Sequence, residues 1–191
     1  MKKTIKDMTT EEKYALFPII IKPYDKRWPD WYNAECQRLL AKCHKEILRI
    51  NHIGSTAVTG LSAKPTIDIL CEIDEKDAQT MTHKLISVGF STEGDPLKKP
   101  LNMVFYKGYT LSGYAEKVFH LHLREKDDHD ELYFRDLLRT DTKVKHAYAK
   151  LKQDLALTHF GNREAYTDAK TDFIKENTLH ARNVFGSKYV K

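Results

Sequence analysis

The chain has 191 residues, of which 41% are hydrophobic and 31% are charged, a composition typical of one folded domain and not of a disordered chain. Its net charge of +5 comes from 32 basic against 27 acidic residues, a mild surplus that favours anionic small molecules. No apolar run approaches the roughly 20 residues of a membrane-spanning helix, and residues 1–13 lack the apolar stretch of a signal peptide. We therefore expect a single cytoplasmic domain over residues 1–191 with no membrane partner.

The cysteines and the basic residues argue against two further classes of protein, those held by disulfides or zinc and those that bind nucleic acid. Cys36, Cys43 and Cys71 are odd in number and lack CxxC spacing, so they are interpreted as core residues and not as a disulfide framework or a zinc knuckle. The densest basic cluster, Lys98-Lys99, is too small for a nucleic-acid surface. A nucleic-acid partner is therefore disfavoured.

Residues 1–18 read as an N-terminal extension with one short helix. Thr9 followed by Glu12 forms a capping-box pattern, and Pro18 ends the helix near Phe17. Residues 19–21 then predict a short strand. The next helix has Pro29 in its first turn and carries a helical stripe of Trp28, Trp31, Tyr32, Cys36, Leu39, Leu40 and Cys43.

The stretch from His52 to Asp74 organises the rest of the chain. A strand over 47–53 leads into a loop of small residues that opens with Gly54-Ser55. Residues 66–73 then alternate with period two, which predicts a strand with an apolar face and an opposite face of Asp68, Leu70 and Glu72.

Further strands and helices follow. We expect a helix over 75–88, a short edge strand over 90–93, and strands over 102–109 and 117–124 joined by a turn at Ser112-Gly113. The second of these two strands places Val118, His120, His122 and Arg124 on one face.

From residue 128 to residue 191 the pattern is helical. Helices are expected over 129–138, 142–159 and 163–183, with Gly161 between the last two. The middle helix carries a stripe of Tyr148, Leu151, Leu155 and Phe160. The elements together predict an α/β (α+β) fold, a mixed sheet flanked by helices, followed by a helical C-terminal part.

Four motifs carry a resemblance to a known family. The strings HIGSTAVTGLSAKPTIDIL, HLHL, FRDLLR and YTDAKTDFIKE occur in the same order as in the GrpB family, between about Ile20 and Glu176. That family is also found fused to some dephospho-CoA kinases and is placed in the nucleotidyltransferase superfamily. The resemblance implies a nucleotidyltransferase-like mixed β-sheet flanked by helices, while the biochemical role of the family is largely unassigned.

The resemblance also implies site residues. In the superfamily a Gly-Ser pair binds the triphosphate, and two acids on one strand hold magnesium ions. Gly54 and Ser55 match the phosphate turn, and Asp68 matches the first acid, which makes Ser55 and Asp68 the catalytic candidates. The second acid is replaced by Leu70, and Glu72 lies roughly 13 Å along the strand, too far to share the metal.

Two histidines offer a different metal site. His120 and His122 are about 7 Å apart on one strand face, a separation that two imidazoles can close around one ion. With Asp68 on a neighbouring strand they would form a two-histidine, one-carboxylate set, suited to zinc, manganese or iron as well as magnesium. The alternative is a half-exposed strand whose histidines meet solvent.

Five cationic residues are candidates for binding phosphate. Lys64 follows the Gly-Ser loop, Arg124 extends the histidine face, and Arg135, Arg139 and Lys170 lie in the motifs shared with the family. For each one alone, a solvent-exposed structural charge is the competing interpretation.

Two functional hypotheses stay open. The first is a metal-dependent nucleotidyltransferase that binds a nucleotide or another phosphorylated small molecule with a divalent metal near Asp68, His120 and His122. The second is a non-catalytic module that binds a nucleotide or coenzyme A. The sequence leaves the acceptor, the identity of the metal (Mg, Mn or Zn) and the oligomeric state open.

Overall fold

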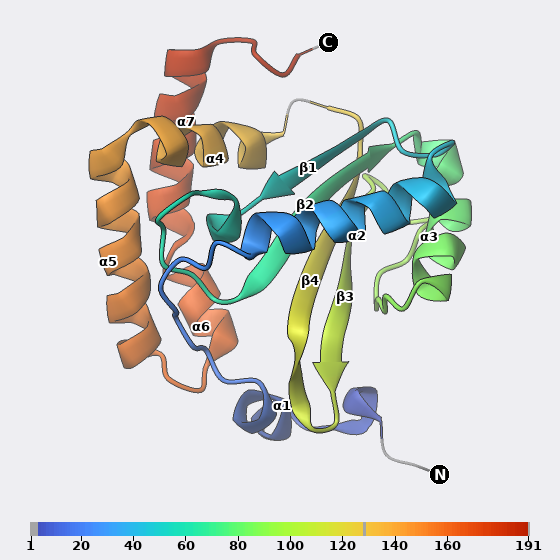
Figure 1. Ribbon diagram of the computed structural model, residues 1–191, viewed down its shortest axis with the longest axis horizontal. Coiled ribbons are helices and arrows are strands. Elements are labelled where there is room, and N and C mark those ends of the chain that lie inside the picture. Colours follow the sequence, from blue (N-terminus) through green and yellow to red (C-terminus); the bar gives the residue numbers. More distant parts are fainter. Residues whose placement is uncertain (1–3, 128, 191) are drawn as a thin grey trace.

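The computed structural model describes residues 4–127 and 129–190 of the chain, and a four-stranded sheet lies at its centre (Figure 1). The strands are β1 (Arg49–Ile53), β2 (Thr66–Ile73), β3 (Asn102–Thr110) and β4 (Gly113–Glu125), in the order β1-β2-β4-β3. β2 and β4 are parallel, whereas the β1–β2 and β3–β4 pairs are antiparallel. The sheet is therefore mixed, and the predicted α/β class is confirmed.

The register of the parallel pair decides which side chains meet. Asp68 on β2 lies opposite His120 on β4, and Leu70 lies opposite His122. Side chains directly opposite each other project to the same face of a sheet. One face of the sheet therefore carries Asp68 together with both histidines, as the alternation of the two strands predicts.

The other face of the sheet is apolar and carries the main core. Helices α2 (Trp28–Cys43) and α3 (Ala78–Ser87) cover it (Figure 1). The core joins the helical stripe to the apolar face of the strands, and its members include Trp28, Trp31, Leu39, Cys43, Ile67, Ile69, Cys71, Ile73, Phe105, Phe119, Leu121 and Leu123. Cys43 and Cys71 are buried free thiols, as expected of core residues.

The polar face of the sheet meets the helical C-terminal part. Helices α4 (Asp130–Thr140), α5 (Thr142–Thr158), α6 (Arg163–Asp168) and α7 (Thr171–Phe185) gather on the β1–β2 side of the molecule (Figure 1). Leu132 of α4 packs on Ile53 and Leu70, so α4 contacts the sheet directly through this small apolar cluster. None of the described helices is long and apolar enough to cross a membrane.

The N-terminal helix α1 (Thr10–Leu16) lies at the far end of the β3–β4 hairpin (Figure 1). Its predicted capping box is present, because Thr9 and Glu12 exchange side-chain and backbone hydrogen bonds. Phe17 is buried against the rings of Tyr109 and Tyr114, and the Tyr114 hydroxyl donates to the Phe17 carbonyl. The N-terminal segment is thereby anchored to the sheet.

Three predicted elements differ in the structure. The strand expected over 19–21 is absent: these residues pair with no strand, and the one bridge nearby joins the next residue, Lys22, to Ala63, directly before Pro23, which has no N–H to continue a ladder. The edge strand expected over 90–93 is a single bridge between Ser91 and Tyr106. The last helix is broken between Asp168 and Thr171 into α6 and α7.

Candidate phosphate-binding site

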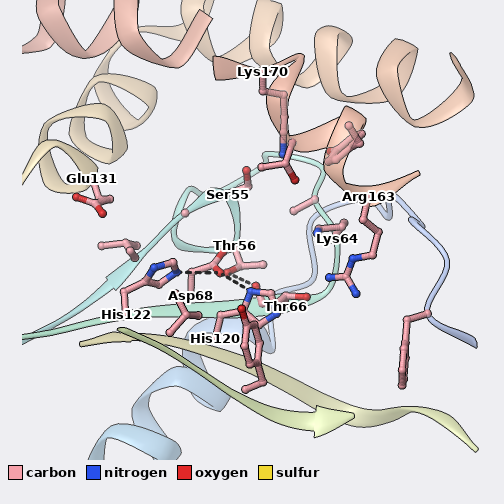
Figure 2. Close-up of a pocket in the computed structure, with 18 of the residues that line it drawn as sticks. Ser55, Thr56, Lys64, Thr66, Asp68, His120, His122, Glu131, Arg163 and Lys170 are labelled. Carbon is pink, nitrogen blue, oxygen red and sulfur yellow. Dashed lines mark hydrogen bonds and ion pairs between the residues drawn. The ribbon is translucent and has the colours of Figure 1, made fainter. Parts of the chain in front are cut away.

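A cavity of about 1350 Å³ separates the polar face of the sheet from the helical part. Its lining includes the Gly54-Ser55 turn, Asp68 of β2, both histidines of β4 and residues of α5, α6 and α7. Figure 2 shows these side chains converging from separate segments of the chain. Lys13 and Tyr14 of α1 also line the cavity.

The turn after β1 needs a glycine for two reasons. Gly54 has a φ of 68°, a backbone conformation that residues with a side chain rarely adopt. A Cβ atom at this position would also overlap the carboxylate of Asp68. The absence of a side chain therefore lets β2 bring its acid against the turn, directly before the short 3₁₀ helix η2 (Ser55–Ala57).

Hydrogen bonds inside the protein fix the shape of this turn. The Nε2 atom of His52 lies 3.0 Å from the hydroxyl oxygen of Thr56, which donates to the Thr66 carbonyl. Burial lowers the pKa of His52 to about 4, so its imidazole is neutral at pH 7. His52 is thus a structural residue of the turn, at the end of β1.

Lys152 of α5 reaches the turn from the opposite wall of the cavity. Its ammonium donates to the Ser55 hydroxyl over 2.9 Å and to the Ser62 carbonyl, and the residue is only 3% exposed. Burial, followed by the charge of Lys170, lowers the pKa of Lys152 to about 7. The Nζ atom also lies 4.8 Å from the centre of the Tyr148 ring.

Two more lysines stand around a single tyrosine. The Nζ atoms of Lys64 and Lys170 lie 5.8 and 4.0 Å from the centre of the Tyr166 ring. Burial, with the charge of Arg163 next, lowers the pKa of Lys64 to about 8, and burial with the charge of Lys64 lowers that of Lys170 to about 8. The ammonium of Lys170 is therefore close enough to those of Lys64 and Lys152 for like charges to disfavour the protonated forms.

Arg163 of α6 completes a group of four cations. Its guanidinium donates to the Tyr109 hydroxyl over 3.2 Å and lies over the Tyr109 ring. Within residues 4–127 and 129–190, the ion pairs of the structure give none of these four cations a carboxylate partner. Lys152 is buried and the other three cations are half-buried, and the acid whose charge acts on the three lysines is Asp68.

Asp68 lies between the two histidines of β4 (Figure 2). Its Oδ1 atom is 3.5 Å from the Nδ1 atom of His120 and 3.9 Å from the Nε2 atom of His122. Burial opposes ionisation of Asp68, but the contacts with His120 and His122 outweigh it and hold the pKa of this carboxyl well below its usual range. The predicted convergence of these three residues is thus present.

The same three side chains have the contacts of a hydrogen-bonded group and not those of a metal site. The Nε2 atom of His120 lies 2.6 Å from the Tyr109 hydroxyl, and the Nδ1 atom of His122 lies 3.3 Å from the guanidinium of Arg124. Among the described residues, no three His, Cys, Asp or Glu side chains are arranged to hold a metal ion. The divalent metal therefore stays a prediction from sequence, and the donors as placed do not fit it.

The three predicted arginines bind protein groups in this structure. Arg124 donates to the carbonyls of Met103 and Leu123, and Arg139 donates to the Ala57 carbonyl over 3.1 and 2.9 Å. Neither of them lines the cavity. Their part in phosphate binding stays a prediction, while their observed contacts stabilise the sheet and the turn.

Arg135 lines the cavity, but it is only 7% exposed and its guanidinium is hydrogen-bonded to several protein groups. It donates to the His52 carbonyl over 3.0 Å, to Asp136 over 2.9 Å and to the Tyr189 hydroxyl over 3.0 Å. These contacts tie α4 and the C-terminal residues to the strand that precedes the Gly-Ser turn.

Sequence reasoning did not single out Lys152 or Arg163. The signal for Lys152 was its position four residues after Tyr148, on the inward side of α5. Phe160, which the predicted stripe includes, lies beyond the end of α5 and is 78% exposed, whereas the buried residues of α5 are Tyr148 and Lys152. Arg163 opens α6 directly after the Gly161 turn, a place with no such sequence signal.

Comparisons with known proteins agree with the fold. The family model described as GrpB protein matches residues 18–179. The crystal structure of the conserved protein GrpB from Enterococcus faecalis superposes with a TM-score of 0.74 and 25% identity, over 87% of this chain and 99% of that one.

Two sequence relatives add to the comparison. UPF0157 protein YqkA of Bacillus subtilis (strain 168) is 30% identical over 163 residues, which span 83% of this chain and about half (46%) of YqkA. The dephospho-CoA kinase of Mycobacterium tuberculosis (strain H37Rv) is 34% identical over 84 residues, 42% of this chain and 21% of the kinase. With a family model that matches most of its length and a fold shared with a GrpB structure, the chain belongs to the GrpB family.

Proposed function

We propose that the protein binds a nucleotide or another phosphorylated small molecule in the cavity between the sheet and the helical part. The observation that carries the proposal is a group of four cations that line this cavity and form no ion pair among the described residues: Lys64, Lys152, Lys170 and Arg163, of which Lys152 donates to Ser55. Phosphate oxygens are strong acceptors for such donors. The Gly54-Ser55 turn lines the same cavity, and its serine hydroxyl adds a donor beside Lys152.

A transfer reaction is the catalytic form of this proposal. Gly54, Ser55 and the lysines would bind the phosphates, and Lys64 or Arg163 would stabilise charge on the leaving group. Asp68, which its histidines keep ionised, is the carboxylate that would accept the proton of an attacking hydroxyl. No step of this proposal depends on the metal ion.

The alternative function is a non-catalytic module that binds a nucleotide or coenzyme A. The observation in its favour is the position of the second superfamily acid, which Leu70 occupies as a fully buried residue of an apolar cluster with Ile53 and Leu132. A binding module would use the same cations and the same turn, without turnover.

Thermal unfolding of the purified chain tests ligand binding. We expect ATP, coenzyme A and pyrophosphate to raise Tm, and adenosine and pantetheine, which lack phosphate, to leave it unchanged. Lys152→Met should remove most of the increase, whereas Lys150→Met, an exposed lysine of the same helix paired with Asp154, should keep it. Equal effects of ATP and adenosine would contradict a phosphate site.

Incubation with α-labelled nucleoside triphosphates and a panel of hydroxyl acceptors then separates the two functions. Release of pyrophosphate with transfer of the label supports an enzyme. Binding without release under the same conditions supports the module.

A further inference from the structure

Around the Gly-Ser turn, more positive than negative charges face the cavity. Four of the cations that line it come from the loop before β2, from α5, from α6 and from the junction of α6 with α7. The acid on the sheet between them, Asp68, has its Oδ1 atom within ion-pair distance of two histidines. The protein therefore offers a surplus of positive charge where the superfamily pattern has two acids that bind metal ions.

The position of the second acid is sealed from the cavity. Leu70 is 0% exposed and packs against Ile53 and Leu132, so a metal between positions 68 and 70 would meet a methyl group and not a carboxylate. The imidazole of His120 has contacts at both nitrogens, with Asp68 and with Tyr109. The atoms near the turn that could bind a metal ion thus already have contacts with other protein groups.

We propose, on the basis of the proposed function, that the lysine cluster takes the place of the divalent cations, and that the cavity binds a condensed phosphate without a metal ion. The lysine cluster consists of Lys64, Lys152 and Lys170. Arg163 adds a fourth charge beside it. The ligand class is a diphosphate or triphosphate ester, or pyrophosphate itself.

Charge balance selects a condensed phosphate over a single phosphate group. A phosphate monoester carries up to about two negative charges at pH 7, whereas a diphosphate or triphosphate carries about three to four. Three lysines and one arginine, set against the single negative charge of Asp68, match the larger value. The other groups around these cations are neutral, since Ser55, Tyr148, Tyr166 and Tyr109 supply hydroxyls and ring faces.

The mutual repulsion of the lysines agrees with this assignment. In the free protein, burial and neighbouring cations lower the pKa values of all three lysines. A bound phosphate chain would raise these pKa values again, so that binding takes up protons from solution. If magnesium ions bridged the phosphates to the protein, the lysines would not take up protons on binding.

Calorimetric titration with pyrophosphate tests the inference. We expect a dissociation constant in EDTA that equals the value in excess magnesium within about threefold, or is lower. Lys152→Met should weaken binding in EDTA by at least about tenfold, because a charge-assisted hydrogen bond is lost from a buried site. Lys150→Met should change the constant by less than about twofold.

Asp68→Asn separates the two modes of binding. Metal-free binding persists or becomes tighter in this variant, because a negative charge beside the phosphates is removed, whereas binding through a metal on Asp68 is lost. Binding of pyrophosphate only with magnesium, and its loss in Asp68→Asn, would overturn the inference and leave the proposed phosphate site intact. No binding of pyrophosphate or ATP in either buffer would overturn both.

Discussion

Two sets of cations lie on the polar side of the sheet, and they are used in opposite ways. The arginines donate to carbonyls, to Asp136 and to a C-terminal hydroxyl, and each therefore has a structural partner. The lysines converge on Ser55 and on two tyrosine rings without a carboxylate. The sets are Arg124, Arg135 and Arg139 on one side and Lys64, Lys152 and Lys170 on the other.

The difference follows from the chemistry of the two side chains. A guanidinium has five donors in a fixed plane and suits several backbone and side-chain acceptors at once, as at Arg135. An ammonium is a compact charge on a flexible stem and loses its proton more readily when buried. The arginines therefore stabilise the turn, while the lysines have the lowered pKa values of half-buried and buried ammonium groups.

Arg135→Met should give the largest loss of stability. The substitution removes donors from the His52 carbonyl, from Asp136 and from Tyr189, and loss of one partner of a buried charged network costs about 3 to 5 kcal/mol. Urea denaturation measures the change, with Arg38→Met, whose side chain is 63% exposed, as a control that costs less than about 1 kcal/mol. Unchanged stability with a tenfold loss of pyrophosphate affinity would instead make Arg135 a phosphate ligand.

Gly54→Ala should destabilise the fold by about 2 to 4 kcal/mol, because it adds a steric overlap with Asp68 to the strain of a positive φ. Gly60→Ala is the matched control: its φ is also positive, at 78°, but a Cβ there meets nothing within 4 Å, so about 1 kcal/mol is expected. Equal unfolding midpoints for the two variants would show that the turn accommodates Asp68 in another way.

Lys152→Met should stabilise the free protein at pH 7 by about 1 to 3 kcal/mol while it weakens phosphate binding, which is the opposite of the Arg135 result. The groups that face the ammonium are Ser55, Tyr148 and, through charge, Lys170 and Asp68. Chemical denaturation with and without pyrophosphate measures both effects. A less stable variant at pH 7 would show that the buried ammonium stabilises the fold.

The same lysine sets a pH dependence with a definite sign. Its pKa falls from 10.5 in the unfolded chain to about 7 in the folded protein, so the unfolded state binds more protons between these values. The free energy of unfolding of the wild type should therefore rise from pH 7 to about pH 10 relative to that of Lys152→Met, and it is lowest in relative terms once the pH has fallen through 7. The difference in free energy of unfolding between Lys152→Met and the wild type should thus narrow as the pH rises from 7 to 10. The curve of Lys150→Met should stay parallel to that of the wild type.

Much of the sheet could be predicted from the sequence. The alternation of residues 66–73 and 117–124 assigned faces correctly, and the observed parallel register brings Asp68 opposite His120. Periodicity works here because each strand has one apolar face against α2 and α3. The strand expected over 19–21 is wrong and the one expected over 90–93 is a single bridge at Ser91, since short runs depend on a partner that the local sequence does not specify.

The site was harder to predict than the sheet. The residue type alone does not show whether a helical lysine is exposed or buried. Lys150 and Lys152 are therefore indistinguishable in the sequence, although only Lys152 reaches Ser55. Arginines in shared motifs suggested phosphate ligands, and only the folded structure shows their carbonyl partners. The cations that line the cavity come from the loop before β2 and from the C-terminal helical part, which lie far apart in the sequence.

Residues outside the family match pack against matched residues on both sides of the matched region. Phe17 precedes the matched residues 18–179 and packs on Tyr109 and Tyr114, and Tyr189 follows them and bonds Arg135 and Asp136. A chain trimmed to the matched residues would lose an aromatic contact of the β3–β4 hairpin and a partner of the buried arginine. The boundary drawn by sequence similarity is therefore narrower than the unit that packs together.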